Sequence, residues 1–304
     1  MTGAFPTHLF DIASLSRSQV ERLFAAAAAP PHSGLLDGAT LANLFYESST
    51  RTRVSFELAA CRLGAEVVNI NASASSATKG EALPDTMLTL AAMGLDFLVI
   101  RHPLVGSIAQ LAAKAPSGLH LVNAGDGAHA HPSQALIDAW TLLRRRGSLD
   151  GLVLTIAGDI RHSRVARSNV VLFTLLGARE IRLAAPPELL PEPLPAGPVR
   201  VFSEFDAALE GADAVMMLRL QKERMSGVKL PAAEAYHAAW GLTAERLARA
   251  GEQCFVLHPG PINRGIEIAS EVADSGQSLI LEQVANGVRM RMAILAALYE
   301  RPAD

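Results

Sequence analysis

The chain alternates short apolar runs with longer segments whose apolar residues recur at helical spacing. The runs are rich in Val, Ile and Leu, which is typical of parallel strands that helices cover on both faces. Strands are predicted at residues 41–45, 66–71, 97–101, 119–123, 152–157 and 180–185. Helices are predicted between them at residues 54–63, 83–93, 107–114 and 164–176. This alternation indicates an α/β fold.

Three further helices are marked by their ends or by one apolar face. A capping box, Ser16 to Gln19, predicts the start of a first helix that ends before Pro30. A helix that follows Pro132 should end in the three arginines at residues 144–146. The last helix carries one apolar face, made of Val284, Val288, Met292, Leu295 and Tyr299.

A chain of 304 residues favours two domains of ordinary size over one. The pattern restarts after the glycines at positions 147 and 151. We therefore predict two doubly wound domains, each with a mainly parallel sheet flanked by helices, joined by interdomain helices. The first covers residues 1–147 and the second residues 148–283, and residues 284–304 form a C-terminal helix that packs back on the first domain.

A polar run, Ser49-Thr50-Arg51-Thr52-Arg53, stands between the strand predicted at 41–45 and the helix predicted at 54–63. Unpaired N–H groups and the positive end of the helix dipole favour an anion at that point. Hydroxyls and planar guanidinium groups add donors that match phosphate oxygens. A capped helix start with solvated arginines is the alternative, but a cap needs only one hydroxyl. The run therefore predicts a phosphate site.

Other polar clusters follow predicted strands, where ligands bind in open α/β sheets. They are residues 101–103, 123–127, 158–159 and 258–261. Any one of them alone could be a surface salt bridge, a turn or a buried histidine. His131 and Gln134 lie one turn apart at a helix start, so they could face one pocket or simply cap the helix.

Composition removes several classes of function. The net charge of −3 gives no reason to expect nucleic acid or a membrane as partner. Cys61 and Cys254 are expected to be reduced core residues, since two cysteines cannot build a disulfide framework. No metal-ligand spacing is present. We also find neither a leader pattern nor an apolar stretch of about 18 residues, so we expect a cytoplasmic protein.

Four motifs in this order resemble the carbamoyltransferase family over essentially the whole chain. They are Ser-Thr-Arg-Thr-Arg at 49–53, Arg-His-Pro at 101–103, His-Pro-Ser-Gln at 131–134 and His-Pro-Gly-Pro at 258–261. Lys-Gly-Glu at 79–81 and Arg-Leu-Gln-Lys-Glu-Arg at 219–224 resemble the members that act on aspartate. Ornithine-type members carry a cysteine where this chain has Gly260.

The resemblance implies transfer of a carbamoyl group from carbamoyl phosphate to L-aspartate. The products are N-carbamoyl-L-aspartate and phosphate, in de novo pyrimidine synthesis. It implies no cofactor and no metal. The first domain would bind carbamoyl phosphate, and the second would bind aspartate.

The resemblance also implies roles for single residues. Arg51, Thr52, Arg101 and His131 form the catalytic set. Ser49, Thr50, Arg51 and Thr52 hold the phosphate, while Thr52, Arg101 and His131 address the carbonyl oxygen. Gln134 and the segment with Gly260 and Pro261 hold the carbamoyl NH₂, through the carbonyls of Pro259 and Gly260. Lys79, Arg164 and Arg219 bind the carboxylates of aspartate.

In the family, the loop that carries Ser75 and Lys79 comes from the neighbouring subunit, which implies a homotrimer with shared sites. Thr78 stands where some relatives have a second lysine, so this loop carries less charge. Arg161 is left as either a third carboxylate contact or a surface charge. Residues 225–241 are expected to form a mobile loop that closes over substrate.

Alternatives remain open at this point. The acceptor could be ornithine or another amine, although a cationic acceptor would call for carboxylates where Arg164 and Arg219 stand. The chain could be a non-catalytic subunit, and a regulatory chain or a dihydroorotase-like partner could join it. A dinucleotide-binding oxidoreductase is disfavoured, because residues 152–159 contain Gly158 but lack the Gly-x-Gly-x-x-Gly spacing.

Overall fold

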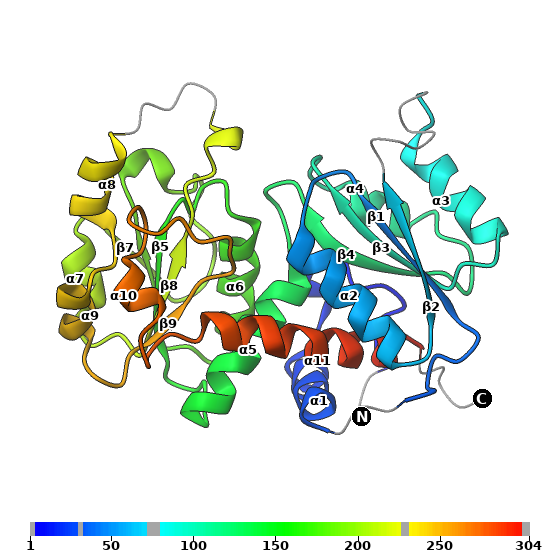
Figure 1. The fold of residues 1–304 in the computed structure, drawn as a ribbon, viewed down its shortest axis with the longest axis horizontal. Coiled ribbons are helices and arrows are strands. Elements are labelled where there is room, and N and C mark those ends of the chain that lie inside the picture. Colours follow the sequence, from blue (N-terminus) through cyan, green and yellow to red (C-terminus); the bar gives the residue numbers. More distant parts are fainter. Residues whose placement is uncertain (1–3, 30–32, 72–79, 226–230, 300–304) are drawn as a thin grey trace. The chain divides into compact units, whose positions relative to one another are not determined.

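The computed structural model describes residues 4–29, 33–71, 80–225 and 231–299. The chain divides into two compact units, one of residues 1–137 and 285–304 and the other of residues 138–284. Each boundary falls inside a continuous helix, α5 (Pro132–Arg146) or α11 (Ile280–Tyr299). Each unit contains one sheet with helices against it (Figure 1).

The first unit has a four-stranded parallel sheet in the order β2-β1-β3-β4. Its strands are β1 (Thr40–Phe45), β2 (Glu66–Asn71), β3 (Phe97–His102) and β4 (His120–Asp126). The chain proceeds from β1 outward to β2 and then returns to place β3 on the other side of β1. The carboxyl ends of β1 and β3 thus form the switch point where such sheets bind ligands.

Helices cover both faces of this sheet. They are α1 (Arg17–Ala28), α2 (Thr50–Arg62), α3 (Leu83–Ala92) and α4 (Ser107–Ala112), with a short 3-10 turn at Ile12–Ser14. Met87 of α3 and Ile108 of α4 pack in one buried cluster with Leu44 and Ile100 of the strands. Successive strand residues point to opposite faces, so Phe97 faces the other way. Its ring lies 5.9 Å from that of Tyr299 in α11.

The second unit has a five-stranded parallel sheet in the order β7-β6-β5-β8-β9. Its strands are β5 (Val153–Gly158), β6 (Glu180–Ala184), β7 (Val199–Phe202), β8 (Ala214–Leu218) and β9 (Phe255–Leu257). Its helices are α6 (Arg164–Leu175), α7 (Phe205–Leu209), α8 (Ala233–Trp240), α9 (Ala244–Ala250) and α10 (Ser270–Ala273), with 3-10 turns η4 (Pro187–Leu189) and η5 (Lys222–Arg224). Here the switch point lies between β5 and β8.

Both faces of the second sheet are also covered. Phe205 of α7 and Leu247 of α9 pack in one buried cluster with Ala157 and Met217. The neighbouring strand residue, Met216, faces α6 on the opposite side, where Asn169 Nδ2 lies 3.7 Å from its sulfur. The predicted fold class, two units with parallel sheets flanked by helices, is therefore confirmed.

Some local predictions were wrong. Helix α2 begins at Thr50, four residues before the predicted start, so most of the polar run forms its first turn. Strand β2 is an edge strand with exposed residues, not a strand covered on both faces. Cys61 is exposed, because it lies on the outer side of α2, whereas Cys254 is buried as expected. The region expected to be a loop at 225–241 contains helix α8.

Gly158 allows β5 and β8 to approach each other. It has φ +114, and a Cβ built on it would lie 2.3 Å from the carbonyl oxygen of Leu218. Gly251 has a similar φ of +101 but nothing within 4 Å of the same position. A substitution at Gly251 would therefore introduce backbone strain alone. The same substitution at Gly158 would add a clash with the neighbouring strand.

We predict that Gly251→Ala lowers the free energy of unfolding by about 1–3 kcal/mol, the strain of such a backbone conformation. Gly158→Ala should cost more than about 4 kcal/mol, because the methyl group also meets backbone that cannot move aside. Urea unfolding of both variants measures the difference. Equal losses would show that the approach to Leu218 is not tight.

Candidate active site

The start of α2 has no cap from its N-cap side chain. Ser49 is the N-cap residue, with φ −157 and ψ 93, and its hydroxyl makes no capping hydrogen bond. Its carbonyl accepts the amide of Arg53 at 3.1 Å, which is the first hydrogen bond of the helix. The amides that precede Arg53 stand at a helix N-terminus, the position at which helices bind anions. Thr52 is buried, whereas Thr50 and Arg51 are exposed.

Strand pairing brings Arg101 next to this helix start. Phe45, the last residue of β1, is in register with Arg101 on β3, and the amide of Tyr46 donates to the carbonyl of Arg101 at 2.9 Å. The guanidinium is largely buried. Its Nε lies 3.3 Å from Oε2 of Glu47, and its Nη1 donates to the carbonyl of Ala124 at 3.4 Å. A buried guanidinium is costly unless it meets anions, and Glu47 supplies one.

His131 lies at the N-cap of α5, just beyond β4. Its carbonyl accepts the amides of Gln134 at 3.1 Å and Ala135 at 3.3 Å. The His131 side chain is 4% exposed, and Gln134 is half-buried on the first helical turn. The structure therefore places the two side chains within one turn of each other, as the sequence predicted.

Two polar residues near this edge have structural roles. Asp126 accepts the amide of Gly106 at 3.1 Å and the hydroxyl of Ser107 at 3.3 Å, so it fixes the start of α4. His102 packs edge-on against Tyr46, with ring centroids 4.8 Å apart. Burial lowers the pKa of His102, which nearby Asp126 and Glu47 only partly oppose. The neutral imidazole then suits a packing role.

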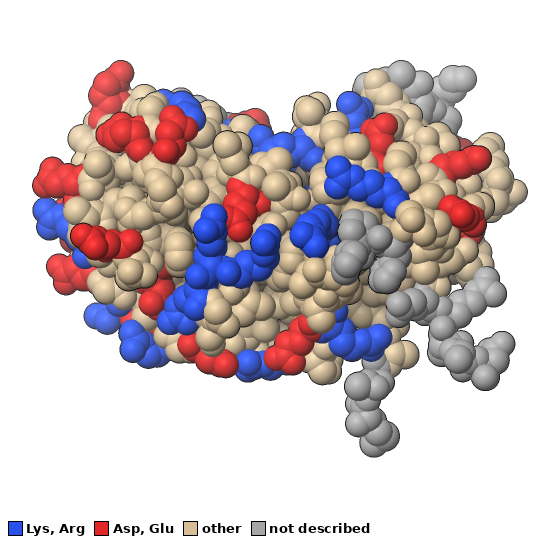
Figure 2. Space-filling view, turned by 60° about the horizontal axis from the view of Figure 1, so that its bottom comes forward, with Lys and Arg blue, Asp and Glu red and all other residues tan. Residues whose placement is uncertain are grey.

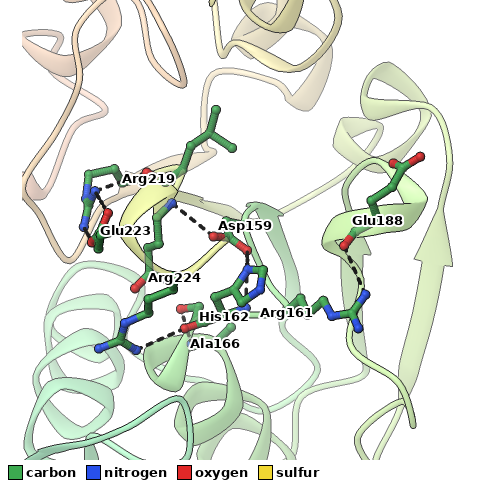
Figure 3. Close-up of polar contacts among 11 residues, drawn as sticks. Asp159, Arg161, His162, Ala166, Glu188, Arg219, Glu223 and Arg224 are labelled. Carbon is green, nitrogen blue, oxygen red and sulfur yellow. Dashed lines mark hydrogen bonds and ion pairs between the residues drawn. The ribbon is translucent and has the colours of Figure 1, made fainter. Parts of the chain in front are cut away.

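In the second unit, Asp159 ties the end of β5 to the end of β8 (Figure 3). It is fully buried. Its Oδ1 lies 2.8 Å from Nδ1 of His162, and its Oδ2 accepts the amide of Gln221 at 3.1 Å. Arg164, the first residue of α6, is 5% exposed. The switch point of this sheet thus brings the segment before α6 close to the segment after β8.

Arg219 follows β8 directly and holds a carboxylate from its own chain. Its two terminal nitrogens bind both oxygens of Glu223, Nη1 to Oε2 at 3.1 Å and Nη2 to Oε1 (Figure 3). These hydrogen bonds hold the pKa of the Glu223 carboxyl below its usual value and raise the pKa of Arg219. The guanidinium is therefore in a position to bind a carboxylate through two bonds.

The remaining arginines of this region bind backbone. Arg161 is exposed and donates to the carbonyl of Glu188 at 3.4 Å, and Arg224 donates to the carbonyl of His162 at 3.4 Å (Figure 3). The structure therefore gives Arg161 a contact with the 3-10 turn η4, which fits a surface role.

His258 is a buried residue that shapes the loop after β9. Its Nδ1 accepts the amide of Gly260 at 2.8 Å, so the ring proton is on Nε2. Nε2 lies 3.1 Å from Oε1 of Glu267, to which it donates. Gly260 and Pro261 are joined by a cis peptide bond. Gly260 is half-buried and Pro261 is exposed to solvent. His258 thus orients the loop.

Several residues of this region were missed by the sequence reasoning. Glu47 stands just before the polar run and could have been noticed as the partner of Arg101. Glu223 lies four residues after Arg219, the spacing of a helical ion pair. Glu267 and Gln283 gave no local signal. Ser75 and Lys79 lie outside the described residues.

Within the described ranges, no three or more His, Cys, Asp or Glu side chains gather as a metal site would require. No helix in that part of the chain is long and apolar enough to cross a membrane. Acidic and basic side chains are both distributed over the face seen in Figure 2.

Family models match nearly the whole chain. The carbamoyl-P binding domain of aspartate/ornithine carbamoyltransferase matches residues 7–144, and the Asp/Orn binding domain matches residues 150–298. The chain belongs to the aspartate/ornithine carbamoyltransferase family. The first match ends at residue 144 and the second begins at residue 150.

Two similar proteins from bacteria have the same name. A protein from Chelativorans sp. is 52% identical over 301 residues, covering 96% of this chain and 93% of its own. One from Rhizorhabdus wittichii is 50% identical over 311 residues, covering 99% of this chain and 98% of its own. Both are named aspartate carbamoyltransferase catalytic subunit.

Solved structures of this family have the same fold. Aspartate transcarbamoylase from Trypanosoma cruzi, in complex with carbamoyl phosphate and aspartate, matches with a TM-score of 0.86 and 31% identity. The match covers 95% of this chain and 96% of that one. The same enzyme in complex with N-(phosphonacetyl)-L-aspartic acid matches with a TM-score of 0.84 at 30% identity, covering 95% and 94% of the two chains.

The pairing of Arg219 with Glu223 leads to a prediction about pH. In Arg219→Gln the pKa of Glu223 should rise toward its ordinary value of 4.5, because the hydrogen bonds that favour its charged form are gone. A depressed pKa stabilises the fold above the ordinary value, and this contribution is lost as the pH falls. The stability difference between wild type and variant should therefore shrink below pH 4.5.

Carboxyl ¹³C NMR titration of Glu223 in both proteins measures the shift. An unchanged pKa in Arg219→Gln would mean that the two side chains are apart in solution.

Proposed function

We propose that this chain transfers the carbamoyl group of carbamoyl phosphate to the amine of L-aspartate. The products are N-carbamoyl-L-aspartate and phosphate, in de novo pyrimidine biosynthesis. The observation that carries the proposal is the start of α2, where Ser49 makes no side-chain cap and three hydroxyls and Arg51 gather at the first turn. The names of the similar proteins and the ligands of the solved structures support the choice of both substrates.

Ser49, Thr50, Arg51 and Thr52 bind the phosphate in this proposal. The leaving phosphate gains negative charge as the bond to carbon breaks. Donors that are already oriented toward that charge stabilise the transition state without reorganisation. The helix dipole of α2 acts in the same direction.

Thr52, Arg101 and His131 act on the carbonyl oxygen. The amine of aspartate attacks the carbonyl carbon, a C–N bond forms, and the oxygen becomes an oxyanion in the tetrahedral intermediate. The bond between carbon and the phosphate oxygen then breaks, and the departing phosphate takes up the proton that the amine loses. Glu47 holds the guanidinium of Arg101 in one orientation, which keeps it ready for the oxyanion.

The carbamoyl NH₂ donates to Gln134 and to the backbone carbonyls of Pro259 and Gly260, in the loop that ends at Pro261. Arg164, Arg219 and Lys79 bind the two carboxylates of aspartate. In this proposal, the substrate carboxylate either replaces the Glu223 carboxylate on Arg219 or binds the edge of the guanidinium that Glu223 does not contact. The cationic side chain of ornithine would meet arginines at both strand ends, which disfavours it as acceptor.

We also propose that the active unit is a cytoplasmic homotrimer, with Ser75 and Lys79 contributed by the neighbouring subunit. Val54 and Leu58, one turn apart on α2, are 41% and 43% exposed and offer an apolar helix face for a subunit contact. Regulatory chains or a dihydroorotase-like partner could join such a trimer. The solution mass of the purified protein, three times that of the chain, tests this assembly.

Substitutions in the phosphate-binding and aspartate-binding parts of the site should affect different kinetic constants. We predict that Arg51→Ala lowers kcat at least about a hundredfold, since it removes a charged donor at the leaving phosphate. Arg219→Ala should raise KM for aspartate at least about tenfold, with a much smaller change in KM for carbamoyl phosphate. Initial rates of carbamoyl aspartate formation measure both.

Arg62→Ala is the matched control, because Arg62 is exposed at the far end of the same helix α2. It should leave all three constants unchanged. A folded Arg51→Ala variant with more than about a tenth of wild-type turnover would contradict the phosphate assignment.

A further inference from the structure

The loop after β9 is held by side chains at three of its backbone amides. The amide of His258 donates to Oε1 of Gln283 at 3.0 Å, and the amide of Gly260 donates to Nδ1 of His258 at 2.8 Å. The amide of Asn263 donates to Oε1 of Glu267 at 2.6 Å. The same glutamate oxygen accepts Nε2 of His258. The direction of the loop's carbonyl groups therefore depends on these side chains.

A buried chain of hydrogen bonds continues from the loop into the helices. Nε2 of Gln283, in α11, donates to Oδ1 of Asp138, in α5, at 2.7 Å. Oδ2 of Asp138 accepts Nδ2 of Asn169, in α6, at 2.9 Å. Asp138, Asn169 and Glu267 are fully buried, and Gln283 is 3% exposed. We call Asp138, Gln283, His258 and Glu267 the loop brace.

Asp138 decides which way the Gln283 amide points. Both oxygens of Asp138 accept hydrogen bonds from amide NH₂ groups, so the nitrogen end of Gln283 must face it. The oxygen end then faces the amide of His258. If the amide turned round, two donors would meet at the loop and a buried hydrogen bond would be lost.

We propose that the loop brace positions the carbonyl oxygens of Pro259 and Gly260 and thereby selects a ligand that carries an NH₂ group over one that carries a methyl group at the same place. The inference rests on the proposed function, in which these carbonyls accept the carbamoyl NH₂. The members of the brace are positioning residues, since they act through the loop backbone. A carbonyl that is turned away can no longer tell the NH₂ from a methyl group.

Acetyl phosphate is the probe, because a methyl group replaces the NH₂ of carbamoyl phosphate while the phosphate is the same. The variants are Gln283→Met and Glu267→Met, which remove the acceptors that hold the amides of His258 and Asn263. Initial rates give KM for carbamoyl phosphate, and competition gives Ki for acetyl phosphate and for inorganic phosphate.

We expect KM for carbamoyl phosphate to rise about five- to tenfold in both variants, which is the worth of about one hydrogen bond. Both Ki values should stay within about twofold, because phosphate is bound by the residues of α2 in the proposed function. Glu267→Gln should behave as wild type, since its amide oxygen can accept the same hydrogen bonds. Asp138→Asn should change the selectivity in the same direction, as it allows Gln283 to turn round.

Thr155→Val is the matched control for a structural effect. Thr155 is fully buried in the same unit, and its hydroxyl donates to the carbonyl of Ala208 at 2.6 Å, away from the loop. This variant should lower stability and leave the ratio of KM to Ki unchanged.

The outcomes separate two failures. A wild-type protein that forms no carbamoyl aspartate overturns the proposed function. An active wild type with unchanged selectivity in Gln283→Met, or in Asp138→Asn if the former does not fold, overturns the brace alone. Equal changes in KM and both Ki values in the folded variants would also overturn it, since they indicate a general loss of structure.

Discussion

The proposed site depends on one constraint, the anion that we place at the start of helix α2. The hydroxyl of Ser49 makes no capping hydrogen bond, and α2 begins a few residues after β1, at the switch point of the first sheet. An uncapped helix start costs stability, which a bound phosphate restores. Because β1 pairs with β3, Arg101 and Glu47 lie beside this helix start. In the proposed mechanism, Arg101 acts from this position on the carbonyl next to the phosphate.

In the second unit, the charged side chains near the switch point between β5 and β8 are paired with groups of the same chain. Arg219 binds Glu223, and Asp159 binds His162 and the amide of Gln221. Each of these charges thus has a partner within the chain, which limits the cost of its burial. The exposed pair is the one that can exchange its carboxylate for that of a ligand, while the buried Asp159 has a structural role.

The sequence predicted best what depends on neighbours in the chain. Apolar runs gave β1, β3, β4, β5 and β6, whereas the phosphate site at the hydroxyl-rich run stays a prediction. The strands and helices between residues 186 and 279 were not predicted, because elements such as β9, with three residues, are too short for a periodic signal. Gln283 could not be identified either, since it acts on Asp138, 145 residues away. Cys61 was misjudged because an apolar run does not reveal which side of a helix is buried.

The central claim is that one site holds a phosphate and a dicarboxylate amine together. Calorimetry with N-(phosphonacetyl)-L-aspartic acid tests it most directly, because the ligand joins both parts in one molecule. A single linked ligand avoids the entropy cost of assembling two, so its Kd should lie at least about a thousandfold below that of phosphate or of aspartate alone. A Kd no lower than that of phosphate would contradict the account.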